Sequence, residues 1–375
     1  MTSLNIAISG AGIGGITAAL ALQAQGHQVT LYERAKEFFR IGADINLTPN
    51  AVYALDGLGQ GVAEALRKTA AQPKFRISRQ WDTGEETSRL EMADAAMEKY
   101  GAPQLTIHRA DLLQALVDAV GDNIRYNHLT TSISQDETGV TLTFADGSEA
   151  QHDLLIGADG IHSITRTTLF GQDAPEFTGL VSYRGVVPAS KLNVPNLDSF
   201  TKWWGSTPDI QIVTFPLNKG EDTFVFATTP QEGWEEESWT CPGDVDELRE
   251  IYRDFHPEAF ALVDACESIT KSALYVREPM SQWSQGRITV LGDAAHPMVP
   301  FMAQGACMAI EDGVVLGRCM ANVDVAGIPA ALQRYEDARK ERTANVQRGS
   351  RGNEWLKKGG NADWVYGYNA WKVEI

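Results

Sequence analysis

The sequence is poor in the features that mark metal-binding and membrane-spanning proteins. Only four of its 375 residues are cysteine, and Cys241, Cys266, Cys307 and Cys319 form no CxxC pair or other ligand-like spacing. We therefore expect reduced, mostly buried thiols, a cytoplasmic location and no metal site. No run of about 18 apolar residues occurs, so we expect no membrane span.

Positive charge is also scarce. The chain has 32 Lys and Arg residues against 49 Asp and Glu, a net charge of −17. An acidic field repels nucleic acid and anionic lipid surfaces, so neither is expected as a partner. At 375 residues the chain can form two lobes or one large α/β body with an inserted domain, and its 43% apolar content is enough for a core.

The amino-terminal stretch carries the first informative motif. Residues 5–9 form an apolar run, glycines follow, residues 16–25 have a helical composition, and residues 29–32 form a second apolar run that ends at Glu33. This order predicts a dinucleotide-binding βαβ unit. Gly10 allows the turn, Gly12 admits a pyrophosphate, and Gly15 lets helix and strand pack closely. The cofactor-binding residues predicted here are Gly10, Gly12, Gly14, Gly15, Glu33 and Arg34.

Two later strands also end in an acid. Residues 153–160 close on Asp159 and a glycine, and residues 287–297 contain Asp293. A buried acid is costly unless ligands satisfy it, and polyol hydroxyls are suitable donors; a helix or loop cap is the alternative for Asp293. Arg109 precedes a helix expected over residues 110–120, where it contacts a phosphate or closes a surface ion pair.

The middle of the chain differs from its two ends. Residues 211–215 and 223–227 alternate between apolar and polar, and predict an antiparallel sheet with one buried face. We divide the chain into a nucleotide-binding domain (residues 1–179), an inserted sheet domain (180–274) and the second part of the first domain (275–375). Residues 74–92 are expected to form a hairpin in the first part, and residues 306–320 and 330–348 are expected to be helices.

The three motifs, in this order, resemble the group A flavoprotein aromatic hydroxylases, the para-hydroxybenzoate and salicylate hydroxylase superfamily. The resemblance implies an α/β fold with a Rossmann-like FAD-binding domain, an inserted antiparallel-sheet substrate domain and C-terminal helices. It implies that the first motif binds the ADP part of FAD. Asp159 then lies between the FAD and nicotinamide sites, Asp293 binds the ribityl or ribose side, and Arg109 meets the phosphates.

The same resemblance extends to the loop after Asp293. It implies that the following helix points its amino end at the isoalloxazine, where the helix dipole stabilises negative charge on reduced flavin. The cofactor-binding residues expected there are Pro300, Gln304, Gly305 and Ala306.

The implied reaction is hydroxylation of a small aromatic ring. FAD is reduced by NADH or NADPH, reacts with O2 to a flavin hydroperoxide, and passes one oxygen to a ring that already carries a hydroxyl. A carboxyl or acyl group on the attacked carbon can be expelled. The alternatives are an NAD-dependent dehydrogenase and a non-catalytic FAD-fold binding module; the protein is expected as a monomer or a homodimer.

Three strings resemble the members of this family that act on 6-hydroxynicotinate: residues 202–204, 302–312 and 364–368. This chain departs from them in the expected pocket, where Asn46, Asp209 and Phe301 stand at histidine positions and Val213 lies near a tyrosine position. Substrates such as 6-hydroxy-3-succinoylpyridine or a salicylate-type phenol therefore stay open.

No residue type decides which group exchanges the substrate proton. The catalytic candidates are His296, Tyr183 and Asp209, and His296 has the alternative role of positioning its loop. The substrate-binding candidates are Asn46, Phe200, Phe215 and Phe301, with core packing as the alternative for the phenylalanines.

Overall fold

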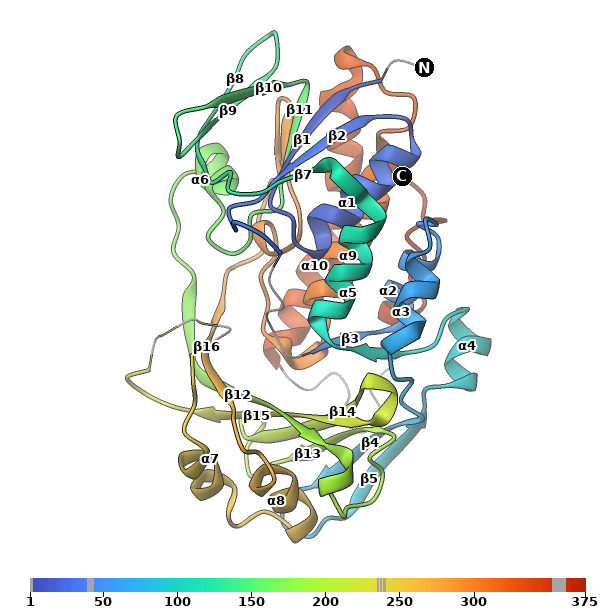
Figure 1. Ribbon diagram of the computed structural model, residues 1–375, viewed down its shortest axis with the longest axis vertical. Coiled ribbons are helices and arrows are strands. Elements are labelled where there is room, and N and C mark those ends of the chain that lie inside the picture. Colours follow the sequence, from blue (N-terminus) through green and yellow to red (C-terminus); the bar gives the residue numbers. More distant parts are fainter. Residues whose placement is uncertain (1–2, 39–43, 235, 237, 239–240, 353–361) are drawn as a thin grey trace.

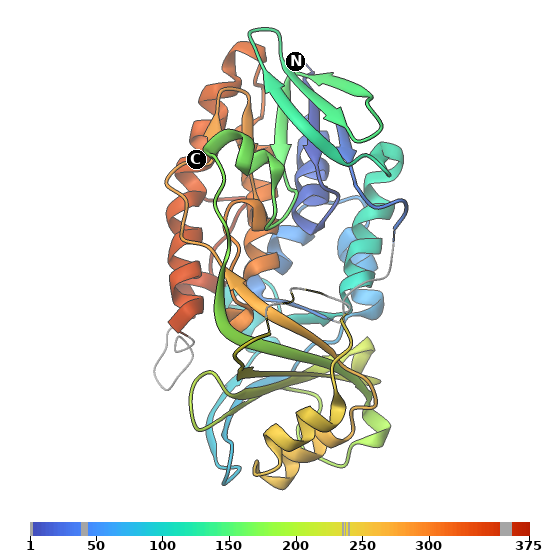
Figure 2. The ribbon, with the colours of Figure 1, turned by 90° about the vertical axis from the view of Figure 1, so that its left-hand side faces the viewer.

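The computed structural model describes residues 3–38, 44–234, 236, 238, 241–352 and 362–375. Two lobes lie one above the other along the long axis, and long strands connect them (Figure 1; Figure 2). The upper lobe is a parallel sheet with helices, and the lower lobe is a large sheet backed by two short helices. Within the described ranges, no helix is long and apolar enough to cross a membrane.

The upper lobe is built on a six-stranded sheet. Its strands, in spatial order, are β17 (Ser284–Gln285), β18 (Ile288–Val290), β11 (Leu154–Gly157), β1 (Asn5–Ser9), β2 (Gln28–Tyr32) and β7 (Ile124–Arg125). All neighbours pair in parallel except β17 with β18. In such a sheet the carboxyl ends of the strands meet at one edge, so the three sequence motifs are brought together there.

Helices cover one face of this sheet and a small antiparallel sheet lies beside it (Figure 1). Helix α1 (Ile13–Ala24) is almost wholly buried because it packs against α5 (Arg109–Val120) and α9 (Gly305–Cys319). The small sheet consists of β8 (Thr130–Gln135), β9 (Val140–Phe144) and β10 (Glu149–His152). The remaining upper helices are α2 (Pro49–Asp56), α3 (Val62–Thr69), α4 (Asp94–Tyr100), α6 (Ile164–Phe170), α10 (Ile328–Gly352) and α11 (Asp363–Tyr366).

The lower lobe is a seven-stranded sheet. Its order is β16 (Thr270–Val276), β12 (Glu176–Pro188), β15 (Asp222–Pro230), β14 (Gln211–Leu217), β13 (Phe200–Trp204), β4 (Phe75–Gln80) and β5 (Glu86–Glu91). The sheet therefore extends beyond residues 180–274. The hairpin of β4 and β5, expected in the first domain, joins it because β4 pairs in parallel with the open edge of β13.

The two faces of the lower sheet have different neighbours. Tyr183 and Trp203 belong to the core that packs under α7 (Val245–Tyr252) and α8 (Pro257–Asp264), which we call the outer face. Side chains alternate along a strand, so the residues next to them point to the other, inner face. There Thr106 of β6 (Leu105–Ile107) donates a 2.6 Å hydrogen bond to the carbonyl oxygen of Pro216, which joins the lobes.

Candidate active site

The glycine-rich turn combines close packing with open space. Gly10 has φ of +102°, and a Cβ there would lie 2.4 Å from the carbonyl oxygen of Ala158. A Cβ on Gly15 would lie 2.2 Å from the carbonyl oxygen of Gly10. A Cβ on Gly12 would meet nothing within 4 Å. Gly10 and Gly15 thus hold α1 against β1 and β11, and Gly12 turns toward space that a pyrophosphate fits.

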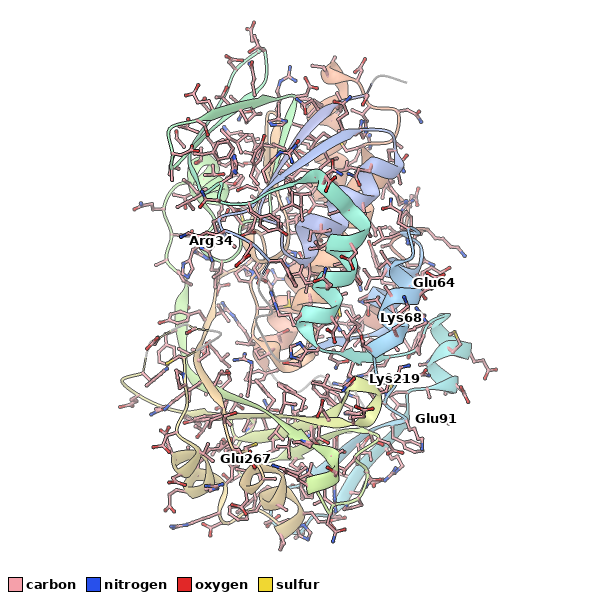
Figure 3. All side chains as sticks on the ribbon, viewed as in Figure 1. Arg34, Glu64, Lys68, Glu91, Lys219 and Glu267 are labelled. Atoms are coloured by element: carbon pink, nitrogen blue, oxygen red, sulfur yellow. The ribbon has the colours of Figure 1, made fainter. Side chains whose placement is uncertain are left out.

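Glu33 lies beside this turn. One carboxylate oxygen accepts the backbone N–H of Ala11 at 3.0 Å, and the other accepts that of Ala35 at 2.9 Å. A carboxylate offers about four acceptor positions, so capacity remains for ribose hydroxyls. Arg34 is exposed on the loop after β2 (Figure 3).

Four charged side chains of the two lobes, Asp44, Arg109, Arg184 and Asp293, interact where the lobes meet, and we call this place the recess. Asp293 is open to solvent, yet the surrounding protein raises the pKa of its carboxyl against the lowering effects of His296 and Arg109. Burial lowers the pKa of Arg109, whereas Asp293 and Asp44 raise it. Arg184 reaches the same group from β12 in the lower sheet.

Asp44 belongs to the same group of charges. Burial raises the pKa of its carboxyl to about 6, although Arg184 and Arg109 act to lower it. Carboxyls and guanidinium groups from both lobes therefore interact in one recess. Its donor set suits the phosphates and hydroxyls of FAD.

Asp159 has a local role. One oxygen of its carboxylate accepts the Ser163 hydroxyl, and the other accepts the backbone N–H and the hydroxyl of Thr165, both at 3.0 Å. Burial raises the pKa of Asp159 and these hydrogen bonds oppose the rise. The acid of the second motif thus fixes the turn that leads into α6, and its predicted place beside a nicotinamide site stays a prediction.

The amino end of α9 is held by side chains. The Gln304 amide donates to the Thr48 hydroxyl at 2.8 Å and accepts from Asn50 at 3.2 Å. Pro300 begins a short 3-10 turn just before it. The first N–H groups of a helix have no partner inside the helix, so those of Gly305 and Ala306 are suited to polar atoms of a ligand.

His296 belongs to the interior and not to the wall of the recess. It is fully buried, and its Nε2 lies 2.5 Å from a carboxylate oxygen of Asp312. The other oxygen of Asp312 accepts from Arg339, which also pairs with Glu311. The geometry supports the role of positioning its loop, and direct contact with a substrate stays a prediction without support from this structure.

The two other catalytic candidates are not brought to the recess. Tyr183 lies on the outer face of the sheet beside Glu247, and its neighbour Arg184 takes the inner face because the strand alternates. Asp209 lies in the turn between β13 and β14, where its carbonyl oxygen accepts the Thr228 hydroxyl at 2.8 Å.

The substrate-binding candidates do gather at the inner face. The rings of Phe200 and Phe215 stack with centroids 5.5 Å apart, and both are buried. Asn46 faces the same side from β3 (Ile45–Leu47). Phe301 packs against an apolar cluster that includes Leu180 of β12. This geometry is compatible with either role of the two stacked phenylalanines, packing in the core or binding of a substrate ring.

Sequence reasoning missed Arg76 on the inner face. Its side chain is buried, with 8% of its surface exposed, and the guanidinium lies 4.4 Å from the centre of the Phe200 ring. It donates to the Tyr366 hydroxyl at 2.5 Å, and no carboxylate of the described residues pairs with it. Burial lowers the pKa of Arg76, against the effect of Tyr366. The alternation of β4 could have indicated it, because Ile77 is a core residue and its neighbour Arg76 must therefore point to the opposite face of the sheet.

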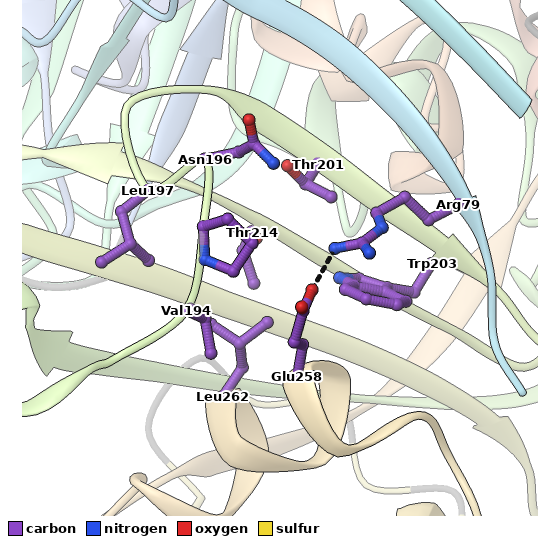
Figure 4. A pocket seen from close by; sticks show the side chains of 10 residues that line it. Arg79, Val194, Asn196, Leu197, Thr201, Trp203, Thr214, Glu258 and Leu262 are labelled. Carbon is purple, nitrogen blue, oxygen red and sulfur yellow. Dashed lines mark hydrogen bonds and ion pairs between the residues drawn. The ribbon is translucent and has the colours of Figure 1, made fainter. Parts of the chain in front are cut away.

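A small cavity lies on the outer face, away from the recess (Figure 4). Arg79 and Glu258 form an ion pair at 2.5 Å across it, and the Arg79 guanidinium lies 4.1 Å from the centre of the Trp203 ring. Its volume of about 10 Å³ holds one water molecule and no aromatic ring. The substrate site is therefore expected at the inner face.

Comparisons with known proteins identify the family of the chain. Residues 3–350 match the model of the FAD binding domain family. The chain is 37% identical to 6-hydroxynicotinate 3-monooxygenase of Pseudomonas fluorescens, over 100% of this chain and 97% of that protein. It is 36% identical to 3-hydroxybenzoate 6-hydroxylase of Polaromonas naphthalenivorans, over 93% and 86%.

Solved structures give the same class. A salicylate hydroxylase substrate complex matches with a TM-score of 0.84 and 27% identity, over 98% of this chain and 96% of that one. HpxO of Klebsiella pneumoniae, in complex with FAD and uric acid, matches with a TM-score of 0.82 and 28% identity, over 96% and 90%. The family match and these relatives thus define the chain as an FAD-dependent aromatic-ring monooxygenase. The chain belongs to the FAD binding domain family.

Proposed function

We propose that this FAD-dependent monooxygenase hydroxylates a small hydroxylated aromatic or pyridine ring that carries a carboxylate. The observation that carries the proposal is Arg76, a buried guanidinium on the inner face without a carboxylate partner among the described residues. A buried cation is costly unless an anion compensates it. Relatives named for 6-hydroxynicotinate and 3-hydroxybenzoate support a carboxylated ring.

The cofactor end of the recess is formed by the upper lobe. Gly12 leaves room for the pyrophosphate, Glu33 accepts from ribose hydroxyls, and Arg109 neutralises phosphate charge. Asp293 accepts hydrogen bonds from a polyol chain, and the amino end of α9 favours negative charge on the ring system. FAD, when bound and reduced by NADH or NADPH, supplies the activation of O2.

The substrate end is formed by the lower lobe. Phe200 and Phe215 offer stacked aromatic faces for the ring, and Arg76 binds its carboxylate with two parallel hydrogen bonds. Arg184 and Lys202 are further cations of the same face. The lobes together exclude water from the reacting atoms.

We also propose that the protein is a cytoplasmic monomer or homodimer. The domain boundaries stay at residues 179 and 274, with β4 and β5 added to the sheet domain.

The proposal is tested by the rate of NAD(P)H oxidation with ring pairs that differ only in the carboxylate. We expect 6-hydroxynicotinate or 4-hydroxybenzoate to accelerate oxidation, whereas 2-hydroxypyridine and phenol do so weakly. Product analysis separates hydroxylation with retention of the carboxylate from hydroxylation with its loss, and 6-hydroxy-3-succinoylpyridine and salicylate test the two alternatives. Equal acceleration by rings with and without a carboxylate would reject the anionic substrate.

Arg76→Gln gives the matched variant. We expect KM for the carboxylated ring to rise about 30- to 100-fold, because a charge-assisted bidentate contact is lost. The KM for the ring without a carboxylate should change less than about threefold. Lys74→Gln, which removes an exposed cation from the start of the same segment, is the control and should change neither.

A further inference from the structure

The side chains of Asn46 and Gln104 form a buried amide pair. The Gln104 Nε2 donates to the Asn46 Oδ1 at 2.7 Å, and the two residues are 0% and 6% exposed, respectively. Within the described residues, the Asn46 Nδ2 and the Gln104 Oε1 have no hydrogen-bond partner. The pair therefore holds one unused donor and one unused acceptor, and buried polar atoms are rarely left unpaired.

This conclusion does not depend on how the two amides are oriented. Nitrogen and oxygen of an amide are assigned from the hydrogen-bond network. If both amides are turned by 180°, Asn46 becomes the donor to Gln104, and the unused atoms become the Asn46 oxygen and the Gln104 nitrogen. One donor and one acceptor remain side by side in either arrangement.

The pair faces the lower sheet. Asn46 stands opposite Thr106 in the pairing of β3 with β6, and its neighbours Ile45 and Leu47 belong to the core of the upper lobe. Thr106 shares the face of Asn46 and donates to the carbonyl oxygen of Pro216 in β14. Gln104 precedes Leu105, another core residue, so the alternation of β6 assigns it to the same face.

The surroundings are those expected of an aromatic binding site. Phe215, next to Pro216, stacks on Phe200. From the upper lobe, the Cys307 thiol in the first turn of α9 lies 3.6 Å from the Asn46 carbonyl oxygen. The two strands that carry the amide pair thus contact β14, the strand of Phe215, through Thr106 and the first turn of α9 through the Asn46 backbone.

We propose that the Asn46–Gln104 pair binds the cyclic amide edge of a 2-pyridone, the lactam tautomer of a 2-hydroxypyridine. The ring N–H donates to the unused acceptor, and the adjacent ring carbonyl accepts from the unused donor. A phenol offers a single oxygen and a C–H at these positions and leaves one amide atom unpaired. The inference rests on the proposed function, and it selects pyridones over phenols within that substrate class.

The test measures dissociation constants by the change in flavin absorbance of the FAD-loaded protein. The probes are 6-hydroxynicotinate and 4-hydroxybenzoate, which share the position of the carboxylate and the ring oxygen and differ in the ring N–H. We expect the wild type to prefer 6-hydroxynicotinate by about 100-fold, because a site built for a hydrogen bond rejects an analogue that lacks it. In the double variant Asn46→Leu with Gln104→Leu, the preference should fall below about tenfold.

The double variant replaces both partners with apolar groups of similar size, so it leaves no amide atom unpaired. Thr201→Val is the control, because it removes a buried hydroxyl that also lacks a partner among the described residues but lies at the outer-face cavity. It should keep the wild-type preference.

The outcomes separate this inference from the proposed function. A wild-type preference near one, with both rings bound, overturns the pyridone assignment and leaves the monooxygenase proposal intact, whether or not the double variant folds. An unchanged preference in a folded double variant also overturns it, because the pair then serves the interior alone. Failure of both rings to bind contradicts the proposed function itself.

Discussion

At the scale of single residues, the motif glycines were predictable because each is required by the conformation or packing of its own turn. The turn at Gly10 requires a positive φ, and the close approach at Gly15 excludes a Cβ, so a glycine-rich pattern between two strands carries that information. Tyr183 was predicted as a catalytic residue, but it lies away from the recess. The sequence of a strand does not show which of its two faces will pack against the other lobe. Arg184, the neighbour of Tyr183, lies on the inner face, and Tyr183 lies on the outer face.

Two alanine variants separate the roles of the glycines. Gly15→Ala places a Cβ 2.2 Å from a backbone oxygen, so we expect a loss of stability of about 1–3 kcal/mol in thermal unfolding. Gly12→Ala meets no protein atom within 4 Å, so the melting temperature without added FAD should change by less than about 2 °C. Its FAD affinity should fall at least about tenfold in a fluorescence titration, because the new methyl group occupies space predicted for the pyrophosphate. Unchanged FAD affinity in Gly12→Ala would contradict the cofactor site.

At the scale of elements, the unit that the sequence did not reveal is the charged contact between α9 and α10. Glu311 and Asp312 accept from Arg339, and Glu311 also pairs with Arg342. Burial acts to raise the pKa of both carboxyls, but Arg339, Arg342 and His296 outweigh it and hold both pKa values below the usual range. Each helix was predictable from its periodicity. The ion pairs between the two helices were not, because they join residues about 30 positions apart in the sequence.

This network predicts a large effect for one substitution. Arg339→Met leaves two carboxylates buried without their common partner, and we expect the free energy of unfolding to fall by about 3–5 kcal/mol. Thermal unfolding at pH 7 measures it. The control is Arg334→Met, which removes a guanidinium that donates to the carbonyl oxygen of Cys319 in α9 and should cost much less.

The same network sets a dependence on pH. The folded-state pKa values of Glu311 and Asp312 are depressed, so their stabilising contribution is present above the unfolded-state values near 4 and is lost as pH falls through the folded-state values. Wild-type stability should therefore decline below about pH 4. Arg339→Met should show a shallower decline there, and an equally steep one would contradict the assignment.

At the scale of the whole molecule, the net negative charge and the position of the buried arginines are separate facts. The net charge of −17 predicted which large partners to exclude, but it concealed Arg76, Arg109 and Arg184 at the interface of the lobes. The order of the three motifs was enough to predict the fold. The substrate end could not be predicted, because it is assembled from β4, β6, β13 and β14, and their meeting depends on the packing of the two lobes.

The central claim is that FAD in this recess hydroxylates a carboxylated, hydroxylated ring. The most direct measurement is the ratio of hydroxylated product to NAD(P)H consumed by the purified, FAD-loaded protein with 6-hydroxynicotinate, with 4-hydroxybenzoate in parallel. We predict that a ring substrate accelerates NAD(P)H oxidation and that the ratio approaches one for at least one of the two. NAD(P)H oxidation that no hydroxylated, carboxylated ring accelerates, or that yields hydrogen peroxide without ring product throughout the panel, would contradict the account.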